Sequence, residues 1–127
     1  MSKQAVKTEN APGAVGPYSQ AIIANGMVFT AGQLGVVPGT KQFAEGGIQA
    51  QTRQALENVK AVLTAAGTDM AHIVKVTVFL YDMNDFAAMN EIYATFFTGQ
   101  PPARSAVQVA KLPLGALIEI EAVARIP

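Results

Sequence analysis

One arginine stands where its own stretch of chain offers no acidic partner. Arg104 lies between a proline-stiffened approach and an alternating apolar run in the segment QPPARSAVQVAKLP. A guanidinium is permanently charged, so burying it without a partner is costly. Arg104 therefore either points into solvent or meets a negative group from elsewhere. Because a guanidinium grips a carboxylate through two parallel hydrogen bonds, the chemistry that it suggests is anion binding.

Two glutamates are the candidate partners within the chain. In the run LIEIEAVARI, Glu119 and Glu121 alternate with Ile118 and Ile120. Alternate residues of a strand face opposite sides, so the isoleucines are expected in the core and the glutamates on the other face. Either glutamate could pair with Arg104 in a surface ladder, which is the commoner arrangement, or belong to a site. These residues alone leave both alternatives open.

Two further side chains, those of Asn90 and Tyr18, could line a site. Asn90 lies four residues after Phe86 and three before Tyr93, on the apolar side of a predicted helix. A buried amide needs partners, so Asn90 either ties to a neighbouring backbone or forms the wall of a site. Tyr18 is expected at a strand end, with its ring in the core and its hydroxyl at the rim. His72, between a helix and a strand, is interpreted as structural.

Composition excludes several kinds of chemistry. The 127 residues fit one domain, 1–127, and nine basic residues balance nine acidic ones. This neutral balance argues against nucleic acid and against anionic membranes as partners. The absence of cysteine excludes disulfides and thiolate chemistry, and a single histidine excludes a multi-histidine metal site. We therefore expect no metal and no cofactor.

The charge content is low for so small a domain. Charged residues make up 14% of the chain, against about 25% in an average soluble domain. The range 10–40 carries no charge, but its prolines and glycines exclude a continuous membrane helix. We expect other copies of the chain to cover part of the apolar surface, as in a homo-oligomer. The first residues, MSKQAVKTEN, lack the apolar core of a signal peptide, which predicts a cytoplasmic location.

The N-terminal third is predicted to form β-strands. Asn25-Gly26 joins two apolar runs and is a strong hairpin signal, because both turn positions need positive φ. It predicts strands over 18–24 and 27–33, with an edge strand over 4–8 and a glycine-rich loop over 34–47.

The remaining sequence alternates helical and strand periods. Apolar residues at three- and four-residue steps predict a helix over 48–66, ended by Gly67. A central strand follows over 72–81, with one face formed by Val74, Val76, Val78 and Leu80. A second helix is expected over 84–99, capped by Asn84 and stopped by Gly99. Two last strands are predicted over 104–110 and 116–126.

The order of elements is therefore β-β-β-α-β-α-β-β. This order is typical of an α+β domain in which one sheet carries both helices on one face. The other face of the sheet would then be uncovered, in agreement with the low charge content.

The segments APGAVGPYSQAI, TAGQLG, ALENVKAVLTAAG, VKVTVFLYDMNDFAAMNEIYATFF, PPARSAVQVAKLP and IEIEAVA, together and in order, resemble the reactive intermediate deaminase (Rid) family. The likeness is to its archetypal RidA, or YjgF-like, subgroup and covers nearly the whole chain. It implies a chorismate-mutase-like homotrimer whose sheets line a central barrel, with sites in clefts between subunits.

The resemblance also implies an activity. Members of this subgroup hydrolyse 2-imino acids, chiefly 2-iminobutanoate and 2-iminopropanoate, to 2-oxo acids and ammonia. These imines, or their enamine tautomers, are released by pyridoxal-phosphate enzymes, so the implied role is detoxification of a reactive metabolite.

Site residues carry over by their motifs. Arg104 of PPARS would grip the substrate carboxylate, and Glu119, the first glutamate of IEIEA, would hold the attacking water. The other positions that would bind substrate are Tyr18, Gly32, Asn90 and the backbone carbonyl of Ala106. Many relatives have cysteine at position 106, so a thiol role is not expected here.

Two other function classes stay open. Relatives described as translation inhibitors with ribonuclease activity imply an RNA-binding module. The sequence has no basic stripe and no aromatic stacking platform, which argues against RNA binding. The other alternative is a trimer of the same fold that binds a small ligand without catalysis. Arg104 would serve such a binder equally well, so Glu119 is the residue that favours an enzyme.

Overall fold

The chain folds into a single sheet with two helices. The computed structural model describes residues 2–127. The elements are β1 (Gln4–Val6), β2 (Ala21–Ala24), β3 (Met27–Thr30), β4 (Gln33–Leu34), α1 (Gly47–Ala66), β5 (Ile73–Leu80), α2 (Phe86–Ala94), β6 (Ala103–Gln108) and β7 (Ile118–Arg125). Short 3-10 turns occupy Met70–His72, Met83–Asp85 and Pro113–Gly115.

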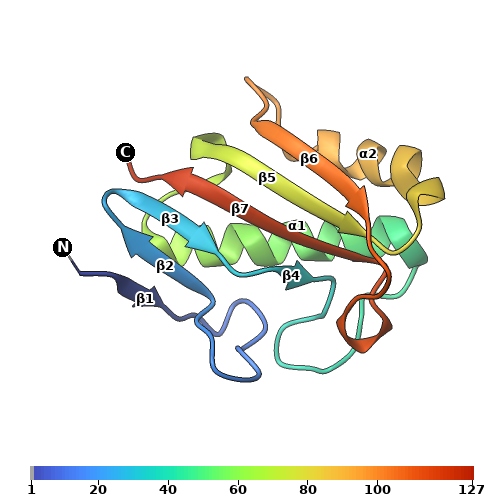
Figure 1. Cartoon of the computed structure of the whole chain (residues 1–127), viewed down its shortest axis with the longest axis horizontal. Coiled ribbons are helices and arrows are strands. Elements are labelled where there is room, and N and C mark those ends of the chain that lie inside the picture. Colours follow the sequence, from blue (N-terminus) through green and yellow to red (C-terminus); the bar gives the residue numbers. More distant parts are fainter. Residues whose placement is uncertain (1) are drawn as a thin grey trace.

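The sheet is mixed and is organised around its last strand. Its order is β1-β2-β3-β7-β5-β6, and the short β4 also pairs with β7. All pairs are antiparallel except β5 and β6, which α2 connects as a parallel crossover. Figure 1 looks onto the sheet with the helices behind it. The expected α+β architecture, with both helices on one face, is confirmed.

Alternation along β5 and β7 builds the core beneath α1. On β7, Ile118 and Ile120 are fully buried, whereas Glu119 is half-buried and Glu121 is exposed on the other face. On α1 the apolar residues recur every three or four positions, so one side of the helix packs against the sheet. Gly67 ends α1 in the left-handed conformation, with φ 90°, as predicted.

The predicted hairpin is confirmed, but its strands are shorter than expected. Asn25 and Gly26 have φ of 55° and 74°. β2 begins at Ala21 and not at residue 18, because the side chain of Gln20 holds the preceding loop. Its Oε1 accepts from the amide of Thr8 at 2.7 Å, and its Nε2 donates to the carbonyl of Pro12 at 2.8 Å.

The run predicted as one strand over 27–33 is divided in two. β3 ends at Thr30, and Gln33–Leu34 forms β4, which lies within the predicted strand and loop and pairs with β7 farther along. The chain therefore leaves the sheet for only two residues, Ala31 and Gly32, before it returns to the same neighbouring strand.

Two details of the second half differ from prediction. A register shift between Ile73 and Lys75 places Ile73 in the core and leaves Val74 43% exposed, so Val74 does not share the buried face. α2 ends at Ala94, and Asn84 does not cap it. Instead, Asp82 accepts from the amide of Asn84 at 2.9 Å and caps the preceding 3-10 turn.

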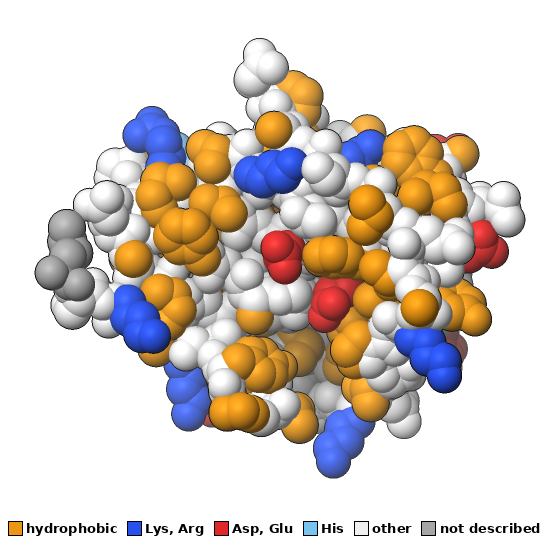
Figure 2. All heavy atoms as spheres, viewed as in Figure 1, with side chains coloured by type: hydrophobic (Ala, Val, Ile, Leu, Met, Phe, Trp, Pro, Cys, Tyr) orange, Lys and Arg blue, Asp and Glu red, His pale blue; other side chains and the backbone are white. Residues whose placement is uncertain are grey.

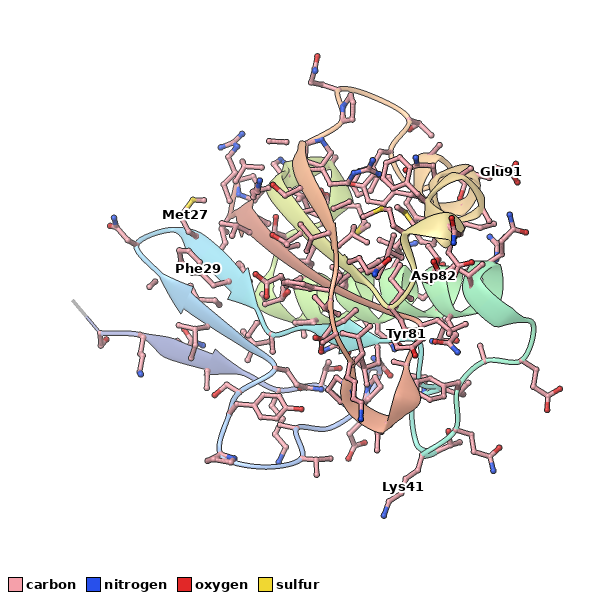
Figure 3. The ribbon with its side chains drawn as sticks, turned by 45° about the vertical axis from the view of Figure 1, so that its right-hand side comes forward. Met27, Phe29, Lys41, Tyr81, Asp82 and Glu91 are labelled. Carbon is pink, nitrogen blue, oxygen red and sulfur yellow. The ribbon has the colours of Figure 1, made fainter. Side chains whose placement is uncertain are left out.

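The face of the sheet away from the helices carries apolar side chains. Phe29 on β3 is 47% exposed and Val107 on β6 is 43% exposed. Figure 2 shows hydrophobic side chains gathered over this face, with acidic groups near its middle, and Figure 3 shows Met27 and Phe29 on β3. This face is the surface that the low charge content predicts to be covered by other copies of the chain.

One glycine sets the distance between β4 and α1. A Cβ atom at Gly35 would lie 2.6 Å from both the Cα atom and the carbonyl oxygen of Gln51. Because these are backbone atoms, α1 or the segment after β4 would have to move. We expect Gly35→Ala to lower the free energy of unfolding by about 1–3 kcal/mol, measured by urea denaturation. Gly13→Ala, where the added atom meets nothing within 4 Å, should leave stability nearly unchanged; equal effects would contradict the close approach.

Candidate functional site

Arg104 lies on the helix-covered face of the edge strand β6. It is paired with Val76 of β5, whose side chain is buried beneath the helices. Its Nη1 donates to Oδ1 of Asn90 on α2 at 2.7 Å. Its guanidinium carbon lies 4.6 Å from the ring centre of Tyr93 and 5.4 Å from that of Phe86. One amide and two aromatic faces therefore hold the charged plane in place.

The structure rules out the surface ladder of Arg104 with the two glutamates. β5 lies between β6 and β7, and Glu119 and Glu121 face the side of the sheet away from the helices. Within residues 2–127 the only salt bridge joins His72 to Asp69, at 2.7 Å. Arg104 thus has an amide partner but no carboxylate, and its remaining N–H groups can take an anion.

Glu119 lies on the open face, between two strands. Its cross-strand partners are Phe79 of β5 and Leu34 of β4. Burial raises the pKa of Glu119, and the neighbouring charge of Glu121 raises it further. A carboxylate with a raised pKa is suited to accept a proton near neutral pH.

Gly32 leaves room for that carboxylate. A Cβ atom at Gly32 would lie 2.6 Å from Cδ of Glu119 and 2.7 Å from its Oε2. The backbone of the break between β3 and β4 therefore passes directly beside the acid. Gly32 and Glu119, predicted to serve one site, do lie together.

Ala106 shares the face of Arg104. It is opposite the buried Val78 of β5 and packs, half-buried, against the core. Arg104, Asn90 and Ala106 thus form one group beside α2, which we call the arginine cluster. Gly32 and Glu119 form a second group on the opposite face, which we call the glutamate cluster.

Tyr18 belongs to neither cluster in this chain. It lies in the loop before β2 with 52% of its surface exposed, so the expectation of a core ring on a strand is wrong. The amide of Val15 donates to its hydroxyl at 3.3 Å. Tyr18 lines a groove of about 790 Å³ between β1 and the loop over residues 11–20.

Two aromatic residues that contact the arginine cluster were not predicted from the sequence. Phe86 and Tyr93 flank Asn90 at helical spacing, a pattern that indicates core packing and does not by itself indicate a site. Tyr93 is buried, and its hydroxyl has no hydrogen-bond partner among residues 2–127. Burial raises the pKa of this hydroxyl, partly opposed by the charge of Arg104.

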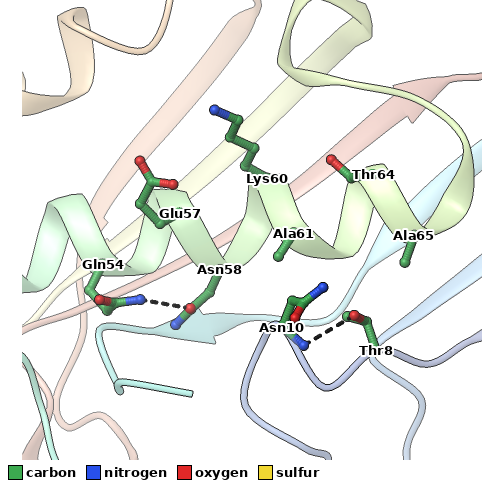
Figure 4. A pocket seen from close by; sticks show the side chains of 9 residues that line it. All are labelled: Thr8, Asn10, Gln54, Glu57, Asn58, Lys60, Ala61, Thr64 and Ala65. Atoms are coloured by element: carbon green, nitrogen blue, oxygen red, sulfur yellow. Dashed lines mark hydrogen bonds between the residues drawn. The ribbon is translucent and has the colours of Figure 1, made fainter. Parts of the chain in front are cut away.

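A separate polar cleft of about 390 Å³ lies between α1 and the N-terminal segment. Figure 4 shows that its side chains bond to one another, with Gln54 donating to Asn58 at 2.9 Å. Asn58 in turn donates to the carbonyls of Leu34 and Val36. These bonds give Gln54 and Asn58 a structural role, which is to hold α1 against the segment that contains β4.

Residues 2–127 contain no group of three or more histidine, cysteine or acidic residues that could hold a metal ion. Among the helices described, none is long and apolar enough to cross a membrane.

Fold and clusters together define a small α+β protein with one open sheet face, an arginine held beside α2 and a half-buried carboxylate on the open face. The family described as Endoribonuclease L-PSP matches residues 8–126. The chain therefore belongs to this family, which is that of the YjgF and RidA proteins, and the resemblance to the Rid group is confirmed.

Named relatives and solved structures agree with this membership. A RutC family protein of Pyrococcus horikoshii is 55% identical over 122 residues, which cover 96% of this chain and 97% of the relative. The human 2-iminobutanoate/2-iminopropanoate deaminase is 48% identical over 122 residues, 96% of this chain and 89% of the relative. The crystal structure of Escherichia coli TdcF with bound serine matches with a TM-score of 0.93 and 46% identity, covering 98% and 99% of the chains. These names support a deaminase of the Rid type.

The raised pKa of Glu119 predicts a pH-dependent gain in stability when its charge is removed. The folded protein holds the proton more tightly than the unfolded chain, so the free energy of unfolding falls as pH rises through the two pKa values. Glu119→Gln should therefore raise the free energy of unfolding at pH 7 by up to about 1 kcal/mol, because a half-exposed carboxylate is partly screened.

The gain should vanish at low pH, where the wild-type carboxyl is protonated in both states. Urea denaturation across the pH range measures it, with the exposed Glu45→Gln as control. An equal gain at every pH would contradict this assignment.

Proposed function

We propose that the protein hydrolyses small 2-imino acids, such as 2-iminobutanoate and 2-iminopropanoate, to 2-oxo acids and ammonia. The observation that carries the proposal is Arg104. It is held by an amide and two rings, has no carboxylate partner among residues 2–127, and leaves most of its N–H groups free. The human relative named for this activity supports the substrate class.

In this proposal Arg104 binds the substrate carboxylate through its planar fork. Asn90 fixes the direction of the guanidinium, and the backbone near Ala106 and Gly32 borders the substrate. Tyr18 would approach from a neighbouring copy of the chain. The serine bound in the TdcF structure shows that a relative accepts a small molecule with a carboxylate.

Glu119 acts as the base. The oxygen of a water molecule attacks the imine carbon, the electron pair of the C=N bond moves to nitrogen, and the proton of the water passes to the carboxylate. The Glu119 carboxyl then returns this proton to the nitrogen of the tetrahedral intermediate. As the C–N bond breaks and ammonia leaves, the hydroxyl group gives its proton to the carboxylate and becomes the carbonyl of the 2-oxo acid. A protonated imine is already electrophilic, so this sequence needs positioning more than activation.

The two clusters lie on opposite faces of one sheet, so the proposed site needs two chains. The arginine cluster of one protomer would meet the glutamate cluster of the next in a homotrimer. The exposed apolar face, with Phe29 and Val107, supports such an assembly. A cytoplasmic location remains a prediction of the sequence.

RNA cleavage is a second candidate, because the matching family is described as an endoribonuclease. The neutral charge balance argues against RNA binding. The single histidine, His72, is hydrogen-bonded to Asp69 and lies outside both clusters. A trimer that binds the same carboxylates without turnover is the third candidate.

Trapping of the imine tests the reaction. Threonine dehydratase generates 2-iminobutanoate in the presence of semicarbazide, and semicarbazone formation is followed against 2-oxobutanoate. The protein should lower the semicarbazone yield, with an acceleration of about 10²- to 10⁴-fold over free hydrolysis.

Glu119→Gln should remove most of this effect and still bind a 2-oxo acid. Arg104→Lys should lose most activity although it keeps the charge, because the fork is lost.

The alternatives give different results in the same experiments. Unchanged semicarbazone yields for both imines would favour the non-catalytic binder. RNA cleavage or retention that weakens with salt, without any effect on trapping, would favour the nucleic-acid candidate.

Mixing two inactive variants tests the shared site. Hybrid trimers of Arg104→Ala and Glu119→Gln should regain activity in about a quarter of their sites, those whose two halves are both intact. Hybrids of Arg104→Ala and Asn90→Ala should regain none, because both changes affect the same half. The wild-type protein should sediment at three times the 13.3 kDa mass of the chain. A monomer, or activity restored equally in both hybrids, would contradict the shared site.

A further inference from the structure

A buried glutamine on α1 bonds to the chain just before Glu119. Gln51 is only 8% exposed. Its side-chain Oε1 accepts from the backbone amide of Leu117 at 3.0 Å. Leu117 immediately precedes β7, and its own carbonyl accepts from the amide of Tyr81 at 3.0 Å. Both backbone groups of Leu117 are thus fixed, two residues before the acid.

The main chain of Gln51 also lies against the segment that follows β4, the strand that pairs with Glu119. Gly35 lies so close to it that a Cβ atom would be 2.6 Å from the Cα of Gln51. Gly35 follows Leu34, the cross-strand partner of Glu119 on β4. One residue of α1 therefore contacts the chain just before β7 and just after β4, next to the paired residues Glu119 and Leu34.

The same segment continues to Gly32, whose backbone lies against the carboxylate itself. Between the helix contact at Gly35 and the acid contact at Gly32 there are only Gln33 and Leu34, both paired with β7. A shift of this segment would be transmitted over a short, hydrogen-bonded path to Glu119.

A polar side chain on a buried helix face lowers the free energy of unfolding unless its polar atoms are hydrogen-bonded. A leucine or methionine would fill the same space without an amide that needs partners. The bond to Leu117 explains why a glutamine is useful here, since it joins a helix to the start of a strand across the core.

We propose that Gln51 is a positioning residue, which holds Glu119 against Gly32 at the distance and orientation that the hydrolysis needs. The inference rests on the proposed function of Glu119. Gln51 does not touch the substrate in this proposal: it lies across the sheet from Glu119 of its own chain, and it acts on that carboxylate through the backbone of Leu117 and Gly35.

Gln51→Met tests the inference, because it keeps the length of the side chain and removes the acceptor. We expect kcat for imine hydrolysis to fall about ten- to a hundredfold, the effect of a displacement of up to about 1 Å at the reacting groups. KM should stay nearly constant, since Arg104 is held by α2 and does not depend on Leu117. Gln51→Glu, which keeps an acceptor oxygen at the same place, should recover most of the lost kcat.

Thr68→Val is the matched control. Thr68 is also 8% exposed, and its hydroxyl donates to the carbonyl of Arg125 at 2.6 Å, at the far end of β7. This variant also loses one hydrogen bond between a buried side chain and the backbone at an end of β7, but at the end away from Glu119. It should lose stability without losing kcat. If Gln51→Met does not fold, Gln51→Asn, whose amide is one methylene short of Leu117, carries the same expectation.

A second readout does not depend on turnover. The carboxyl carbon of Glu119 can be titrated by NMR, and its midpoint should move toward that of an exposed glutamate in Gln51→Met but not in Thr68→Val. Unchanged kcat and titration in Gln51→Met, or equal losses of kcat in both variants, would overturn the inference. If the wild-type protein hydrolyses no imine, the proposed function fails, and the titration alone then decides whether Gln51 positions Glu119.

Discussion

The structure depends on the pairing of β7 with strands on both of its sides. β3 and β4 bind one edge of β7, and β5 binds the other, so the last strand joins the N-terminal hairpin to the β5-α2-β6 unit. Because side chains alternate along β7, one side of the strand contributes to the core and the other side carries Glu119. Ile118 and Ile120 pack beneath α1, and Glu119 between them is forced onto the open face. A shift of one residue would bury the acid and expose the core.

This geometry separates the charges that the proposed reaction would bring together. Arg104 faces α2 from an edge strand, where rings and an amide hold it. Glu119 faces the opposite side, where Gly32 leaves space for it. A single chain thus keeps its cation and its base apart, and they do not neutralise one another. In the proposed assembly they would meet only where two chains meet, with the substrate carboxylate as the anion that Arg104 lacks.

Local signals predicted most of the fold. The Asn25-Gly26 turn, the helix closed by Gly67 and the alternation of β7 each depend on a few adjacent residues. Strand order did not follow from them, so the insertion of β5 between Arg104 and the glutamates escaped prediction. The resemblance to a family named the residues that the structure groups into the arginine and glutamate clusters, but the place of Tyr18 depends on side-chain bonds from Gln20 to a distant loop. Such non-local contacts have no periodic signature in the sequence.

The position of β7 in the middle of the sheet also shapes how the chain folds. β7 must insert between strands that are made before it, because Phe29 pairs with Val123 and Val78 with Ile120. Such pairings close long loops and slow folding. Until β7 arrives, β3 and β5 each expose an unpaired edge with apolar residues, a form prone to self-association. During synthesis on the ribosome, the nascent chain therefore cannot complete its sheet before residues 118–125 have emerged.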